Sequence, residues 1–228
     1  MSTLYIGIMT GTSLDGIDIV IAKIASSSQI STVHSSSYVL ESSLTNALAE
    51  LSRPDFTPKS LIQIKSLEQA YTDALILAVN SAIHSFSCEQ VSSEPTAVKS
   101  TELKINAIGV HGLTVCHQPE LTRPFTWQIV DAHRLAVETG IDVVYDFRSK
   151  DVALGGQGAP LVPEFHKQLF SQYGPEFAVL NLGGIANISA WPQGSTHKPC
   201  DDQEVIGFDT GPANTLMDLW IARHQNRP

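Results

Sequence analysis

The chain has 228 residues, of which 43% are hydrophobic, and its formal net charge is −9. This length allows one large domain or two smaller ones with a substantial core. The acidic balance leaves no basic surplus for nucleic acid or an anionic membrane surface, so the sequence argues against both kinds of partner. The acidic balance does not exclude binding of a small phosphorylated ligand, because such a ligand needs only local N–H groups.

The cysteines and the N-terminus predict a cellular setting. There are three cysteines, an odd number without metal-ligand spacing: Cys88, Cys116 and Cys200. The first residues form a strand pattern and lack the features of a signal peptide. No run of about 18 apolar residues suggests a membrane span. We therefore expect a reduced, cytoplasmic setting.

The opening stretch, Tyr5–Ala22, consists of two short apolar runs separated by a small polar turn. Ile and Val dominate the runs, which favours two strands. Glycines and hydroxyls in the turn suit a concavity of N–H groups that binds phosphate oxygens, and an ordinary tight hairpin fits equally well. Asp15 and Asp18 could hold Mg²⁺ or could serve as turn and capping groups.

A polar segment and two helical patterns follow the hairpin. Residues Ser26–Ser37 predict a turn that leads to a third strand near Ser37–Leu40. Ser42 and Ser43 could cap a short helix that ends at Leu51. Apolar residues at three- and four-residue spacing from Leu61 to Ile83 predict a long helix with one buried face. The segment Cys88–Thr101 is predicted to be a solvated loop.

Strands then alternate with helices, which indicates an α/β fold. The expected elements are the strand Lys104–Val110, the strand Phe125–Val130, the helix Asp131–Glu138 ended by Gly140, and the strand Ile141–Tyr145. Ligands of such folds bind at the carboxyl ends of strands, where His111 and Arg148 lie. A structural histidine is an alternative for His111. For Arg148 and Lys150, binding of a substrate carboxylate and a solvated surface pair are both open.

A second copy of the opening pattern begins at Phe177. The glycine-rich segment Leu154–Pro163 is predicted to be irregular, and a helix is predicted from Pro163 to Phe170. The stretch Phe177–Trp191 then repeats strand, glycine-rich turn and strand, with Gly183 and Gly184 in the turn. This repeat suggests two related domains that face each other, residues 1–176 and an incomplete second domain, residues 177–228.

Asp209 is the candidate general base of the chain. The strand Val205–Phe208 leads directly to it, and a helix is predicted over Ala213–His224. The alternative is that Asp209 caps this helix. Asn187 and Asn214 offer amides to a sugar or phosphate, although turn stabilisation explains them as well. The helix is expected to direct three apolar residues inward: Leu216, Leu219 and Trp220.

Several of these motifs resemble one family. The stretch Met9–Asp18 closely resembles the signature of anhydro-N-acetylmuramic acid kinases. Further stretches match in the same order: His111–Thr114, Asp146–Arg148, Leu154–Pro163, Asn181–Asn187 and Gly207–Asn214. The resemblance implies an actin-like ATPase (ribonuclease H-like) fold, with a mixed sheet flanked by helices. It also implies use of ATP and Mg²⁺ to convert 1,6-anhydro-N-acetylmuramic acid and water to N-acetylmuramic acid 6-phosphate in peptidoglycan recycling, and a homodimer.

The resemblance also implies residue roles. Asp209 would be the base that activates water. His111, Arg148, Asn187 and Asn214 are the candidate sugar contacts, and Asp15 and Asp18 the candidate Mg²⁺ ligands. The residues assigned to ATP phosphates are Gly11, Thr12, Ser13, Leu14, Asp15, Gly16, Ile17, Asp18, Gly183 and Gly184. A non-catalytic sugar- or phosphate-binding fragment is the alternative.

The sequence departs from the family pattern at three positions. Leu113 stands where glutamine is common, and Val130 and Ala213 stand where glycine is common. Family members also continue past residue 228, with an adenosine-binding glycine motif in that part. We therefore expect residues 1–228 alone to lack a complete nucleotide site and to be inactive.

Overall fold

A computed structural model of the chain describes residues 3–11, 13–26, 29–53, 56–57, 60–93, 104–174, 177–191 and 205–225. The chain divides into two compact units, Met1–Ser149 (unit 1) and Lys150–Pro228 (unit 2). The assignment of residues 1–176 to one domain and 177–228 to a second stays a prediction. Each unit contains its own sheet and helices, which agrees with the predicted α/β class.

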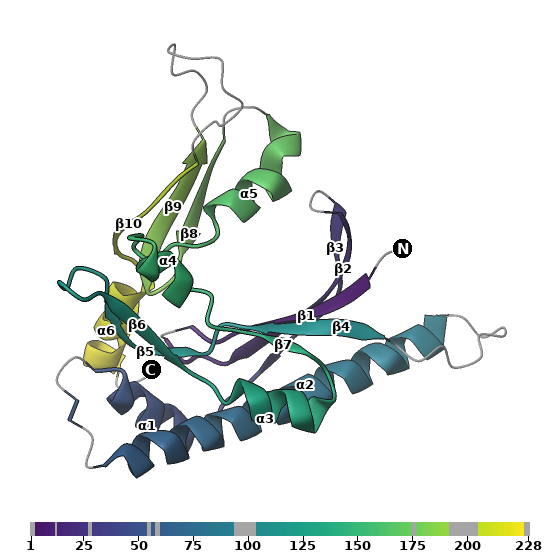
Figure 1. The fold of residues 1–228 in the computed structure, drawn as a ribbon, viewed down its shortest axis with the longest axis horizontal. Coiled ribbons are helices and arrows are strands. Elements are labelled where there is room, and N and C mark those ends of the chain that lie inside the picture. Colours follow the sequence, from purple (N-terminus) through teal and green to yellow (C-terminus); the bar gives the residue numbers. More distant parts are fainter. Residues whose placement is uncertain are drawn as a thin grey trace. The chain divides into compact units, whose positions relative to one another are not determined.

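Unit 1 is built on a five-stranded mixed sheet with the order β3-β2-β1-β4-β7. Its strands are β1 (Thr3–Met9), β2 (Ile17–Ser26), β3 (Gln29–Tyr38), β4 (Ile105–Val110) and β7 (Val143–Val144). β1 pairs antiparallel with β2 and parallel with β4, and β4 pairs parallel with β7. The carboxyl ends of the parallel strands β1, β4 and β7 therefore lie at the same edge of the sheet (Figure 1).

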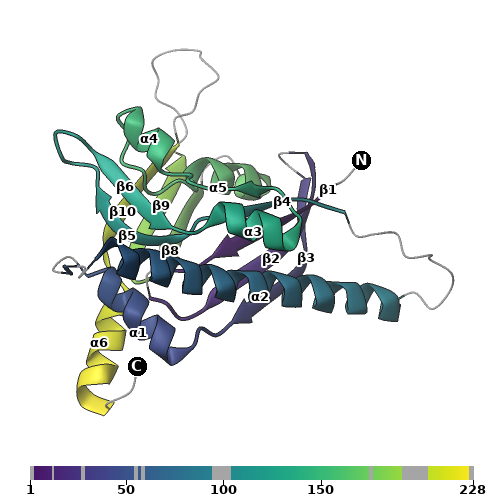
Figure 2. The same ribbon diagram turned by 60° about the horizontal axis from the view of Figure 1, so that its bottom comes forward.

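Helices cover one face of this sheet because alternate strand residues are apolar. Ile6 and Ile8 of β1 and Ile19 of β2 are buried. Helix α2 (Leu61–Ser93) packs against β2 and β3, and α1 (Ser42–Leu51) packs beside α2 (Figure 2). These residues and the inner face of α2 form one continuous core. None of the described helices, α2 included, has the length and apolar composition needed to cross a membrane.

Helix α3 (Ala132–Thr139) is fixed to α2 by polar contacts around its N-cap residue, Asp131. The Asp131 carboxylate accepts the backbone N–H of Arg134 at 3.0 Å and the Gln69 side-chain amide at 2.6 Å. The hydrogen bond from Gln69, followed by that from Arg134, lowers the pKa of Asp131. Gly140 ends the helix, as predicted. β5 (Leu113–Gln118) and β6 (Phe125–Ile129) form a separate hairpin.

Unit 2 contains an antiparallel three-stranded sheet with the order β10-β9-β8. Its strands are β8 (Phe177–Leu182), β9 (Ile185–Trp191) and β10 (Ile206–Pro212). Its helices are α5 (Pro163–Phe170), the 3₁₀ turn Ser171–Tyr173 and α6 (Asn214–Gln225); the short helix α4 (Ser149–Ala153) begins at the boundary between the units. α5 packs on β8 and β9 (Figure 1), where the His166 ring nitrogen Nδ1 lies 2.9 Å from Ser189 Oγ.

Three expected elements differ in the structure. The segment after residue 28 was expected to be a turn, but β3 begins at Gln29 because its residues complete a long hairpin with β2. Helix α2 continues to Ser93, into the segment that was expected to be a loop. β5 was not predicted, since its apolar residues Leu113 and Val115 are too few to make an alternating pattern; it forms by pairing with β6.

The expectation that α6 buries its apolar face is wrong for this chain. Leu216, Leu219 and Trp220 are 59%, 61% and 66% exposed. Helix α6 is held at its first turn by hydrogen bonds to the β8–β9 turn. Beyond that turn, no described residue of α6 is buried. The helix forms locally, and its apolar face stays open to solvent.

The fully buried side chain of Tyr71, in α2, lies beside Thr10, which follows β1. Burial raises the pKa of Tyr71 to about 12, and the Thr10 hydroxyl lowers it by less. Neither hydroxyl completes a hydrogen bond to any described residue. Tyr71 thus supports the end of β1 mainly through packing.

We expect Tyr71→Phe to leave the free energy of unfolding unchanged or to raise it by up to about 1 kcal/mol, because it removes a buried hydroxyl without a hydrogen-bond partner. Urea unfolding measures this change. As a control for the same helix face, Leu75→Ala should cost about 2–5 kcal/mol. A loss above about 1.5 kcal/mol in Tyr71→Phe would mean that the hydroxyl makes a strong hydrogen bond.

Candidate functional site

The turn between β1 and β2 is anchored by Leu14. The Leu14 N–H donates to the Gly11 carbonyl at 3.0 Å, and Leu14 has a positive φ of 57°. Its side chain and that of Ile17 are buried in the core, whereas Ser13 and Asp15 are exposed. Of the predicted phosphate residues here, Leu14 and Ile17 can offer a ligand only their backbone. Thr12 lies outside the described residues.

The two carboxylates of this turn have different surroundings. Asp18 lies opposite Met9 in the hairpin, and its Oδ1 accepts a hydrogen bond from Ser37 Oγ of β3. Asp15 is exposed and makes no hydrogen bond to any described residue. In the part of the chain that the structure describes, no three His, Cys, Asp or Glu side chains gather as a metal site. Asp15 is therefore the more available of the two carboxylates, and a role of either in binding Mg²⁺ stays a prediction.

His111 and Arg148 meet at the shared edge of the sheet. They follow the parallel strands β4 and β7, and Arg148 Nε lies 2.7 Å from His111 Nε2. His111 Nδ1 lies 2.7 Å from the Gly112 carbonyl oxygen. Burial, and then the charge of Arg148, lower the pKa of His111, while the Gly112 hydrogen bond opposes this shift. The structure brings these two residues together; their role toward a ligand stays a prediction.

Two departures from the family pattern have simple structural outcomes. Leu113 is fully buried opposite Ile129 in the β5–β6 hairpin, so it fills the core instead of reaching a ligand. Ala213 has no positive φ, so alanine is accommodated there without strain. Leu113 therefore removes a polar side chain from this edge, whereas Ala213 changes little.

In unit 2, a row of polar side chains crosses the sheet beside the Gly183–Gly184 turn. Asn187 of β9 lies opposite Asn181 of β8 on one side and Asp209 of β10 on the other. Directly paired residues project from the same face of a sheet. We call Asn181, Asn187 and Asp209 the polar row. Asn181 was not singled out from the sequence; its pairing with Asn187 is set by the register of β8 and β9.

Asp209 lies inside β10, one residue before an irregularity in the pairing. The strand was expected to end at Phe208, but it continues because Thr210 Oγ1 donates to the Ala186 carbonyl at 3.1 Å and Gly211 adopts a φ of 143°. The Asp209 carboxylate is exposed and makes no hydrogen bond to any described residue, so it does not cap α6. It is available to accept a proton from a bound molecule.

The glycine turn of unit 2 also holds the start of α6. The backbone N–H groups of Ala213 and Asn214 donate to the carbonyls of Gly184 and Gly183, each at 2.9 Å. The Asn214 side-chain amide donates to the Leu182 carbonyl at 2.8 Å. These contacts support the turn-stabilising interpretation of Asn214, and contact with sugar stays a prediction. The same contacts occupy the carbonyls of both glycines, and binding of phosphate by their N–H groups stays a prediction.

Asp151 organises the glycine-rich segment that follows α4, and sequence reasoning missed it. Its Oδ2 accepts the Gly158 N–H at 2.7 Å, and its backbone carbonyl accepts the Gly156 N–H at 2.9 Å. A Cβ at Gly156 would lie 2.2 Å from the Asp151 carboxylate, so a larger residue there would displace that carboxylate. The sequence signal that could have identified Asp151 is an acidic residue shortly before a cluster of glycines.

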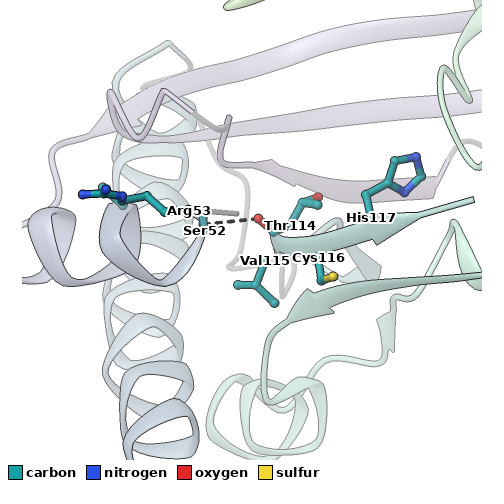
Figure 3. A pocket seen from close by; sticks show the side chains of 7 residues that line it. Ser52, Arg53, Thr114, Val115, Cys116 and His117 are labelled. Atoms are coloured by element: carbon teal, nitrogen blue, oxygen red, sulfur yellow. Dashed lines mark hydrogen bonds between the residues drawn. The ribbon is translucent and has the colours of Figure 1, made fainter. Parts of the chain in front are cut away.

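One pocket in unit 1 contains none of the predicted site residues. It has a volume of about 380 Å³ and lies between the end of α1 and β5 (Figure 3). Ser52 Oγ donates to the Thr114 carbonyl at 3.3 Å within it. Arg53 and His117 point away from each other in Figure 3, so they do not converge on one ligand. Its lining residues are Ala49, Ser52, Arg53, Thr114, Val115, Cys116 and His117.

Comparison with known proteins gives one consistent result. A family model described as anhydro-N-acetylmuramic acid kinase matches residues 3–228. Proteins of that name from Shewanella baltica (strain OS223) and Shewanella sp. (strain ANA-3) are 41% and 43% identical over 224 and 225 residues. Each alignment covers 98% of this chain and 55% of the relative. The chain therefore spans about half the length of the curated relatives it matches.

Gly16 is the position of the β1–β2 turn most sensitive to an added methyl group. A Cβ there would lie 2.8 Å from the Tyr38 carbonyl oxygen, which belongs to a paired strand and cannot move freely. We expect Gly16→Ala to lower the free energy of unfolding by about 1–3 kcal/mol in urea titrations. Gly7→Ala is the control, because a Cβ at Gly7 meets no atom within 4 Å. Equal stability of the two variants would contradict this description of the turn.

Proposed function

Because the chain belongs to the anhydro-N-acetylmuramic acid kinase family, we propose that it carries the sugar- and phosphate-binding residues of an ATP-dependent kinase. The proposed reaction converts 1,6-anhydro-N-acetylmuramic acid and water to N-acetylmuramic acid 6-phosphate in peptidoglycan recycling. The observation that carries the proposal is the exposed Asp209 carboxylate, which has no hydrogen-bond partner among the described residues and lies next to Asn187 in the polar row.

Asp209 is proposed to act as general base. Its carboxylate accepts a proton from water as the water oxygen attacks the anomeric carbon of the sugar. The bond from that carbon to the bridging 6-oxygen breaks, and the 6-oxygen takes the γ-phosphoryl group of ATP while ADP leaves. Asn187, fixed opposite Asp209 by the β9–β10 register, is positioned to orient a sugar hydroxyl or the water.

The β1–β2 turn and the Gly183–Gly184 turn are proposed to bind phosphate. Exposed N–H groups of small-residue turns stabilise the charge that develops on a transferred phosphoryl group. Asp15 would contribute a carboxylate to Mg²⁺. Asp18 is the less available carboxylate, because it already accepts a hydrogen bond from Ser37. When bound, Mg²⁺ neutralises phosphate charge.

Further properties follow from family membership as proposals. The mixed sheet flanked by helices in unit 1 is compatible with an actin-like ATPase (ribonuclease H-like) fold. We also propose that the protein acts in the cytoplasm, binds only the amino sugar and ATP, and forms a homodimer at the length of its relatives. The acidic charge supports the exclusion of nucleic acid from this set.

The decisive variant is Asp209→Asn, made in a chain extended to the length of the relatives. It should lower kcat for ADP release with the anhydro sugar by about 10²–10⁴-fold, because the amide cannot accept the water proton. Asp218→Asn, the same change in the exposed helix α6, should keep activity within about twofold. A folded Asp209→Asn protein with full turnover would refute the assignment of the base.

Chain length provides a second test. Residues 1–228 cover 55% of the Shewanella baltica relative, so we expect them alone to release negligible ADP with the anhydro sugar in a coupled assay. The extended chain should consume ATP only when the anhydro sugar is present, because water attack and phosphoryl transfer are linked through the 6-oxygen. Robust turnover by residues 1–228 would contradict the expectation about chain length.

A further inference from the structure

We propose that His111 is a positioning residue for Arg148: it accepts the Nε–H of Arg148 as a neutral imidazole and so fixes the plane in which the guanidinium meets a substrate carboxylate. This inference rests on the proposed function and on the interpretation of Arg148 as a contact for a carboxylate of the sugar. It adds a role for His111 that requires no contact between the imidazole and the sugar.

The hydrogen-bond pattern determines the tautomer of His111. Arg148 has only donors, so His111 Nε2, which lies 2.7 Å from Arg148 Nε, must be the acceptor. A neutral imidazole then carries its proton on Nδ1, which lies 2.7 Å from the Gly112 carbonyl oxygen and donates to it. Both ring nitrogens are therefore used within unit 1. Protonation of Nε2 would place two donors against each other and break the contact with Arg148.

The backbone around both residues is fixed. Gly112 has a φ of 76°, and a Cβ there would lie 2.9 Å from the Ile129 carbonyl oxygen. Asp146, two residues before Arg148, has a φ of 56°. Phe147 lies against Gly109 of β4, where a Cβ would be 3.7 Å from its ring. The acceptor His111 thus follows the paired strand β4, and the donor Arg148 follows the paired strand β7.

The electrostatic surroundings favour the same arrangement. Burial lowers the pKa of His111, and the positive charge of Arg148 lowers it further, so the neutral form is favoured near pH 7. A guanidinium that is fixed through Nε presents its plane in a defined direction. Planar recognition of a carboxylate by two parallel hydrogen bonds depends on that direction.

The tautomer can be measured on residues 1–228 without any turnover. Heteronuclear NMR of ¹⁵N-labelled imidazoles, with His111→Asn to assign the signal, should show Nδ1 protonated and Nε2 unprotonated at pH 7. Arg148→Met should keep Nδ1 protonated through the Gly112 contact and change the ¹⁵N shift of Nε2, because Nε2 loses its hydrogen-bond donor. An Nε2-protonated or doubly protonated ring in the unmodified chain would overturn the proposal, whatever the activity of the enzyme.

The positioning role is tested by two isosteric variants of the extended chain. In His111→Asn the amide nitrogen replaces Nδ1, keeps the Gly112 contact and cannot reach Arg148. In His111→Gln the side-chain oxygen replaces Nε2 and can accept from Arg148. We expect His111→Asn to raise KM for the anhydro sugar about tenfold with KM for ATP unchanged, and His111→Gln to restore KM to within about threefold.

Equal impairment of the two variants, or an equal rise in KM for both substrates, would overturn the positioning role. Absence of any turnover with the anhydro sugar in the unmodified extended chain would instead refute the proposed function. The NMR measurement then still decides whether His111 accepts the Arg148 hydrogen bond, so the two failures are distinguishable.

Discussion

The pairing of β1 on both of its sides is the constraint on which unit 1 depends. β1 forms a hairpin with β2 and a parallel pair with β4, so its end is carried to the edge where β4 and β7 also end. The buried isoleucines of β1 and β2 keep this register, since a one-residue slip would turn them to the other face. The β1–β2 turn and the His111–Arg148 contact therefore occur at one edge as a consequence of strand pairing.

Strand register has the same importance in unit 2. The pairing of Asn187 with both Asn181 and Asp209 places three polar side chains on one face, and the irregularity after Asp209 keeps it at the end of that row. Irregularities of this kind often re-aim side chains beside functional sites. Local hydrogen bonds to the glycine turn fix α6 without burying its apolar residues, so the geometry of the row does not depend on packing of that helix.

The sequence predicted those parts of the molecule that local patterns determine. The long helix, the helix that begins near Asp131, its end at Gly140 and most strand positions follow from periodicity and capping residues. The extra length of β3 and the presence of β5 depend on a partner strand, which a local pattern does not contain. The open face of α6 could not be foreseen either, because the apolar spacing of Leu216 and Trp220 indicates burial whether or not a partner is present.

The site was predictable to a similar extent. Glycine-rich turns and carboxylates after strands indicated the candidate segments, and the structure brings His111 and Arg148 together after β4 and β7. The partner of Asn214, which is the Leu182 carbonyl, and the role of Asp151, which binds glycine N–H groups, depend on long-range or loop geometry and emerged only from the structure.

The central claim is that a carboxylate in the polar row activates water for attack on the sugar. Turnover of the extended chain in ¹⁸O-labelled water, followed by mass spectrometry of the sugar phosphate, tests this claim most directly. The account predicts one ¹⁸O atom on the anomeric hydroxyl and none on the phosphate. Label in the phosphate group, with none on the anomeric carbon, would contradict it.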